Sequence, residues 1–156
     1  MATLSEVTQF LFDVASNDQL VNTIAFTQSD QIDKNKENLY PLFNIDIIET
    51  LFISGISNTR FRVTIVTDRD IKPRLHNDKV FNSNLIDNLN ECHSIAGRFI
   101  QIVKLPNEGN ITVEDITTIT MLKGAYNNEL DGVQFDMLLW HDISKSTANP
   151  PGPNDC

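Results

Sequence analysis

Cysteine, basic residues and long apolar stretches are all scarce in this 156-residue chain. Of its two cysteines, Cys92 lies in an apolar pattern and Cys156 is the last residue, so we expect no disulfide and a reducing compartment. No apolar run approaches the roughly 18–20 residues of a membrane-spanning helix, and we therefore expect no membrane partner. The N-terminal sequence lacks the basic and apolar regions of a signal peptide, so none is expected.

Basic residues number 12 against 21 acidic ones, which gives a formal net charge of −9. A nucleic-acid-binding surface needs clustered Lys and Arg side chains that release counterions from phosphates. The densest basic groups are Arg60/Arg62 and Arg69/Lys72/Arg74, and both are interleaved with acidic or apolar residues. They could form a local basic patch, but the interleaving favours the solvated edges of a strand and its following loop. The charge balance thus predicts no specific nucleic-acid binding.

The length and the 40% apolar share fit one globular domain. We place this domain at residues 1–143 and a flexible, proline-rich tail at residues 144–156. The tail lacks the apolar residues needed to bury a surface of its own. We expect it to be mobile or to become ordered on a partner.

Two segments have the periodicity of amphipathic helices. The first follows the capping-box sequence Thr3-Leu-Ser-Glu6 and ends near Asn17. The second follows a predicted N-cap at Ser83 and ends before Pro106. Its predicted apolar stripe consists of Leu85, Leu89, Cys92, Ala96, Phe99 and Val103, widened by Ile86, Ile95, Ile100 and Ile102. The stripe indicates a helix that packs against a sheet.

Strand patterns occupy much of the remaining sequence. Residues 21–26 are rich in β-forming residues and predict a first strand. Residues 40–53 and 60–67 flank a Gly/Asn-containing turn at residues 54–59, a pattern typical of an antiparallel hairpin.

A second hairpin is predicted near the end of the domain. Its strands are residues 111–122 and 132–141, around a loop at residues 123–131. Together with the two helices, these elements predict an α+β fold in which an antiparallel sheet of about four to five strands has two helices packed on it.

No arrangement of residue types matches a known catalytic motif. His76, His93 and His141 are far apart, and the chain has no P-loop, G-x-S-x-G or G-x-G-x-x-G sequence. Cys92 falls on the apolar helix face, where it behaves as a small hydrophobe. We therefore predict no catalytic, cofactor-binding or metal site, and no cofactor.

One acidic group leaves an enzymatic alternative open. Asp68 and Asp70 end a predicted strand and Asp46 lies on the preceding one, so the three carboxylates could hold Mg²⁺ in a nuclease. A nuclease usually also places a Lys beside such acids, and neither strand carries one. The other interpretation is that Asp68 and Asp70 end the strand and cap a turn. A monomeric regulatory adaptor of similar fold is a further hypothesis.

Several short segments within residues 1–142, taken in their order along the chain, resemble those of a known group of proteins. These are Asn22-Thr-Ile-Ala-Phe-Thr-Gln-Ser-Asp-Gln-Ile-Asp33 with Lys36 and Tyr40-Pro-Leu-Phe43, then Phe61–Asp68, Leu85–Leu105 and Asp131-Gly-Val-Gln-Phe-Asp136. In this order they resemble small virion structural proteins of tailed phages of Bacteroidetes, including crAss-like phages. The order of elements is also similar to that of tail-terminator and neck proteins, which form rings at the head–tail junction.

The resemblance implies a virion structural protein assembled in the host cytoplasm, in a neck, tail-terminator or tail-completion ring. Its partners would be further copies of itself and portal, adaptor or tail proteins, with packaged DNA passing through the ring. It would act by protein–protein assembly and not as an enzyme. Both hairpins are longer than the core requires, so we expect the loop at residues 123–131 or the loop at residues 54–59 to contact a neighbouring subunit. Exposed aromatic residues often anchor interfaces. The candidate interface residues are Ala125, Tyr126, Asn127, Asn128 and Trp140.

Overall fold

A computed structural model describes most of the predicted domain. The described residues are 3–34, 39–53, 55–68, 85–106, 111–116, 118–126 and 130–142. The predicted N-cap Ser83 and the predicted tail at residues 144–156 lie outside them. The elements in chain order are α1 (Leu4–Ser16), β1 (Thr23–Ala25), the 3-10 helix η1 (Ser29–Lys34), β2 (Leu42–Ile53), β3 (Ile56–Asp68), α2 (Leu85–Val103), β4 (Thr112–Val113), β5 (Thr120–Ala125) and β6 (Leu130–Asp142).

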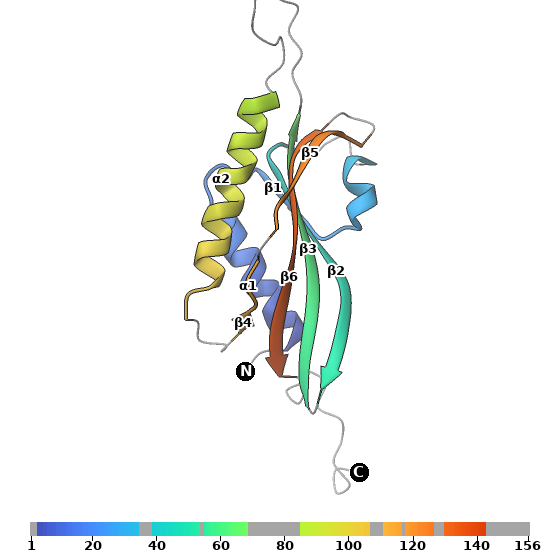
Figure 1. Ribbon diagram of the computed structural model, residues 1–156, viewed down its shortest axis with the longest axis vertical. Helices are drawn as coiled ribbons and strands as arrows, with labels where there is room; N and C mark the ends of the chain where they lie inside the picture. Colours follow the sequence, from blue (N-terminus) through green and yellow to red (C-terminus); the bar gives the residue numbers. More distant parts are fainter. Residues whose placement is uncertain are drawn as a thin grey trace, which may run out of the picture.

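The strands form one six-stranded sheet in the order β1-β2-β3-β6-β4, with β5 also pairing with β6 (Figure 1). The predicted α+β class and the β2–β3 hairpin are confirmed, and β5 and β6 form a second antiparallel hairpin. The prediction of one strand over residues 111–122 is wrong: this segment contains β4 and the start of β5, which continues to Ala125 inside the predicted loop. Thr112 and Thr120 are eight residues apart, but their partners Trp140 and Gln134 on β6 are six apart, so the segment cannot keep one register. The expectation of a purely antiparallel sheet is wrong, because β1 pairs in parallel with the first residues of β2. A parallel pair needs a crossover connection, and the polar segment containing η1 between β1 and β2 provides it.

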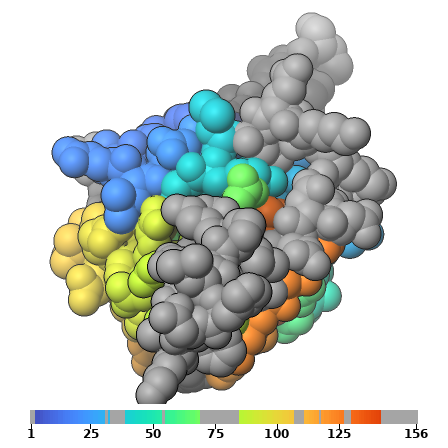
Figure 2. Space-filling view, turned by 90° about the horizontal axis from the view of Figure 1, so that it is seen from above, coloured from blue at the N-terminus to red at the C-terminus, as the bar shows by residue number. Residues whose placement is uncertain are grey.

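Both α-helices cover the same face of the sheet. Figure 1 shows α1 and α2 on one side and η1 on the other, and in Figure 2 the N-terminal segment and α2 gather side by side. The capping box predicted for α1 is present: Thr3 Oγ1 accepts from the backbone N–H of Glu6, and Glu6 Oε2 accepts from that of Thr3, each at 3.2 Å. These two bonds satisfy N–H groups that the first turn leaves open.

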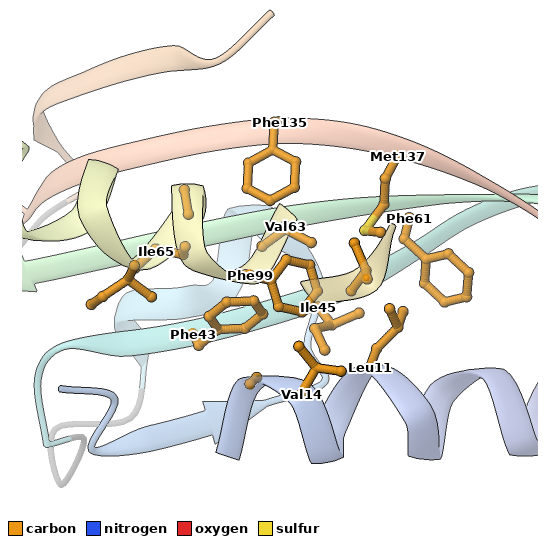
Figure 3. Packing of buried hydrophobic residues seen from close by; sticks show 14 of the residues in the cluster. Leu11, Val14, Phe43, Ile45, Phe61, Val63, Ile65, Phe99, Phe135 and Met137 are labelled. Atoms are coloured by element: carbon orange, nitrogen blue, oxygen red, sulfur yellow. The ribbon is translucent and has the colours of Figure 1, made fainter. Parts of the chain in front are cut away.

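The main core lies between the two helices and the sheet (Figure 3). The ring of Phe99 on α2 lies 4.8 Å from that of Phe43 on β2 and 6.3 Å from that of Phe135 on β6, measured between centroids. Around these rings the sheet contributes the alternating side chains Ile45, Phe61, Val63, Ile65, Val133, Met137 and Leu139. The predicted alternation of the closing strand is therefore confirmed.

The buried stripe of α2 is narrower than the sequence predicts. Ile86 and Ile102 are exposed, and Leu89 is only half-buried. Asn88 is buried instead, because its side-chain amide donates to the Asp68 carbonyl at 2.8 Å and to the Asp131 carboxylate at 3.3 Å. A polar side chain that is hydrogen-bonded in this way can occupy the helix–sheet interface.

The β2–β3 hairpin is longer and its turn tighter than predicted. β2 continues to Ile53 and β3 begins at Ile56, so most of the predicted loop at residues 54–59 is strand. Gly55 has a φ of +83°, a conformation that glycine adopts at little cost and that suits a short hairpin connection. At this tip β3 still pairs with β6, as Ile56 lies opposite Asp142, so the hairpin end stays within the sheet.

The opposite face of the sheet is only partly covered. Near η1 a small second cluster consists of the buried residues Ile32, Leu42, Val66 and Leu130, with Tyr40, Leu122 and Tyr126 packed against them. Midway along the sheet, this face is polar. Arg62 and Asp136 pair across β3 and β6 at 2.8 Å, and Gln134 donates to Thr64 at 3.0 Å.

Candidate interaction surface

The distal half of β2 presents large apolar side chains to solvent. β1 pairs only with Leu42, Phe43 and Asn44, and no other described strand pairs with this edge of β2. Beyond Asn44 the strand therefore forms an open sheet edge. The exposed apolar residues of β2 and of the start of β3 are Ile47, Ile48, Leu51, Phe52, Ile53 and Ile56, which are between 38% and 66% exposed.

A β-bulge changes which face these residues occupy. The register of β2 on β3 shifts between Ile47 and Glu49, so that Ile47 pairs with Phe61 and Phe52 pairs with Ser57. Phe61 and Ser57 lie on the same face of β3, because side chains four residues apart share a face. Ile47 and Phe52 consequently both point to the helix-covered side, although they are an odd number of positions apart.

A groove of about 360 Å³ adjoins this edge. Its lining consists of Thr8, Gln9, Phe12, Phe26 and Ile47, contributed by α1, by the residue after β1 and by β2. The rings of Phe12 and Phe26 stack at 6.4 Å and both remain exposed. We refer to Phe12 and Phe26 together with the six exposed residues of the hairpin as the edge patch.

The edge patch carries no net charge. Between Ile47 and Arg60 the only charged residues are Glu49 and Arg60, and their side chains pair at 3.2 Å. The groove lining has no ionisable side chain. On a chain with a formal charge of −9, this neutral region is distinct from the acidic remainder.

The interface residues predicted from the sequence lie elsewhere. Ala125 and Tyr126 are half-buried at the end of β5, and Tyr126 packs on the second cluster. Trp140 lies near the other end of β6, roughly 33 Å away at the usual rise per residue, and its Nε1 donates to Glu114 at 2.8 Å. Asn127 and Asn128 lie outside the described residues. The structure therefore does not bring Trp140 together with the predicted loop residues.

Of the edge patch, the sequence predicted only the segment that contains Ile56 as a contact, although a signal for the rest was present. The segment Ile47-Ile-Glu-Thr-Leu-Phe-Ile53 is apolar at positions of both parities, unlike the clean alternation of β6. Such a run is typical of a strand covered on both faces. Here the second face and the outer edge have no covering layer among the described residues.

The acidic residues of the nuclease alternative do not converge. Asp46 accepts hydrogen bonds from the backbone and hydroxyl groups of Ser29 at 2.9 and 2.8 Å. It pairs in register with Arg62, six residues before Asp68 on β3, which separates the two backbone positions by roughly 20 Å. Asp70 lies outside the described residues, and within those described no group of three His, Cys, Asp or Glu side chains could hold a metal ion.

We expect Asp68→Ala to change the free energy of unfolding by less than ~1 kcal/mol. Burial raises the pKa of the Asp68 carboxyl, so the fold disfavours its charged form and loses little when the carboxyl is removed. We also expect the purified wild-type chain not to cleave DNA with Mg²⁺ or Mn²⁺. Metal-dependent cleavage that Asp68→Ala abolishes would establish the nuclease alternative.

Among the described residues, Cys92 and His141 are buried in the fold and His93 faces solvent. Burial, with smaller effects of Glu91 and Asp131, raises the pKa of the Cys92 thiol to about 12, so it stays protonated at neutral pH. His141 is buried and its Nε2 lies 2.7 Å from Thr59 Oγ1, whereas His93 is exposed. His76 lies outside the described residues. The thiol is therefore a core group, as the sequence pattern predicted.

A second groove, of about 390 Å³, lies between the end of α1 and α2. At its rim Arg98 donates to both carboxylate oxygens of Asp18, at 2.7 and 3.1 Å. Burial alone would raise the pKa of Asp18, but the hydrogen bonds from Arg98 and the Leu20 N–H and the Arg98 charge together lower it. The pair connects α1 to α2, and we interpret the groove as part of the helix packing.

Two further findings bear on the class of protein. None of the helices in the described segments is long and apolar enough to cross a membrane. The chain matches no model of a known protein family and no curated protein. The edge patch is therefore the feature of the fold on which a functional proposal can be based.

Proposed function

We propose that this chain is a structural subunit of a phage virion that acts by protein–protein assembly. The observation that supports assembly is the edge patch, whose eight large apolar side chains are each at least 38% exposed. Large exposed apolar side chains beside an open strand edge are typical of a protein–protein interface. The virion, and a ring at the head–tail interface as the place of assembly, are supported by the resemblance of the sequence to phage neck, tail-terminator and tail-completion proteins.

The fold suits such a role mechanically. β3 pairs with β2 on one side and along its whole length with β6 on the other, so the sheet has a rigid centre. The outer edge of β2 is open to neighbours, which we take to be other copies and portal, adaptor or tail proteins. The net charge of −9 would repel packaged DNA and so limit its adhesion to the ring.

Incorporation into phage particles tests the proposal. The double variant Ala125→Glu with Tyr126→Asp places charges at the end of β5, where the sequence predicts contact with a neighbour. We expect its occupancy in purified particles to fall at least ~10-fold, which corresponds to ~1.4 kcal/mol of contact free energy. Tyr126 packs on the second cluster, so a thermal melt must first show that the variant folds.

Two outcomes count against this proposal in different ways. Wild-type occupancy of a folded double variant would mean that the β5–β6 loop is not an interface. If the wild-type chain is absent from purified virions, the structural-protein proposal itself fails. Mass spectrometry of purified particles distinguishes these outcomes.

A further inference from the structure

The outer edge of distal β2 has the features that natural edge strands usually avoid. Such edges are normally protected by charged side chains, above all Lys, by Pro, by β-bulges or by very short length. From Ile45 to Ile53, β2 has one bulge and the acidic residues Asp46 and Glu49, but it contains neither Lys nor Pro and has no partner strand among the described residues on this side. A partner strand that offers both backbone groups and apolar side chains would fit this edge.

Two copies of this edge, placed side by side and antiparallel, would bring complementary side chains next to each other. Phe52 and Ile47 point to the same face and lie five positions apart, on either side of the strand's midpoint near Glu49. If two β2 edges pair antiparallel about that midpoint, Phe52 of each copy comes beside Ile47 of the other. Ile47 lines the 360 Å³ groove that Phe12 and Phe26 form, so the phenyl ring of Phe52 would meet an apolar recess.

Charge indicates a second copy as the partner. Two chains of formal charge −9 repel over most of their surfaces. The edge patch is the neutral region, since Glu49 and Arg60 cancel each other and the groove lining is uncharged. A basic partner would instead favour the acidic parts of the surface.

We infer that two copies of this chain pair in solution through the outer edges of β2, antiparallel about a twofold axis, with Phe52 of each copy in the Phe12/Phe26/Ile47 groove of the other. A twofold contact uses the same surface on both copies and closes after two. Both open edges are then paired, and edge-to-edge growth stops. This inference concerns the isolated chain. The dimer uses the same edge patch on which the proposed assembly rests, so it would have to dissociate before the chain enters a particle.

Light scattering on the purified full-length chain tests the pairing. We expect a mass of about twice 17.6 kDa that falls to the monomer value on dilution. Phe52→Asp should raise the dimer dissociation constant at least ~30-fold, as for the loss of a buried aromatic anchor. Ile86→Asp is the matched control, because Ile86 is 69% exposed and Phe52 66%, and it lies on α2 outside the edge patch. It should leave the dissociation constant unchanged.

Engineered disulfides test the geometry independently of affinity. In a Cys156→Ser background, Gln9→Cys with Phe52→Cys should give a covalent dimer on oxidation, since Gln9 lines the groove. Phe52→Cys alone should not, because the twofold arrangement keeps the two copies of residue 52 apart. A monomer at every concentration, open-ended aggregates, or a dimer that Phe52→Asp does not weaken would each overturn the inference.

Discussion

Phe99→Asp is expected to leave a chain without a cooperative thermal transition. Phe99 is 3% exposed and packs between Phe43 and Phe135 at the centre of the main core. Truncating such an aromatic side chain costs about 3–5 kcal/mol, and an unpaired carboxylate in its place adds a desolvation penalty. The free energy of unfolding of such a domain is only about 5–15 kcal/mol. The destabilisation by this substitution is therefore comparable to the entire stability of the fold.

Leu89→Asp serves as the comparison for Phe99→Asp, because it introduces the same carboxylate at another position of α2. The sequence pattern predicts equal burial at both positions, but Leu89 is half-buried in the structure. Its variant should fold with a lowered melting temperature, because the carboxylate can reach water. Circular dichroism melts of both variants check this. A wild-type melting temperature for Phe99→Asp would mean that α2 does not pack on the sheet through this face.

Gly132→Ala is expected to destabilise the domain by at least ~3 kcal/mol. Gly132 on β6 pairs with Val66 on β3, and a Cβ built there would lie 1.8 Å from the carbonyl oxygen of Ile65. The obstructing atoms belong to the backbone of a central strand, so they cannot move aside without separating β3 from β6. A single methyl group should therefore lower the denaturation midpoint strongly.

Gly97→Ala is the matched control for this substitution. Gly97 lies within α2, and a Cβ there would meet no atom within 4 Å. Alanine is a better helix former than glycine by about 1 kcal/mol, so this variant should be slightly more stable than the wild type. Denaturant titrations of the two variants should shift the midpoint in opposite directions. Equal midpoints would show that β3 and β6 approach less closely at Gly132.

The sequence by itself determined the elements whose signals are local. The capping box at Thr3 and Glu6 defined the start of α1, and apolar spacing defined α2 with Phe99 and Cys92 on its buried face. Alternation along residues 133–139 identified the core face of β6. These predictions hold because a capping bond or a strand's alternation depends on residues only a few positions apart.

Only the tertiary structure decided which of these surfaces are covered. The parallel pairing of β1 ends at Asn44, which leaves the rest of β2 as an open edge, and the bulge after Ile47 turns Phe52 to the helix side. The strand's own sequence does not specify where a neighbouring strand stops or how far α1 and α2 reach along the sheet. For that reason the same apolar pattern that predicts a buried strand became, at Ile47–Ile53, the most exposed apolar segment of the sheet.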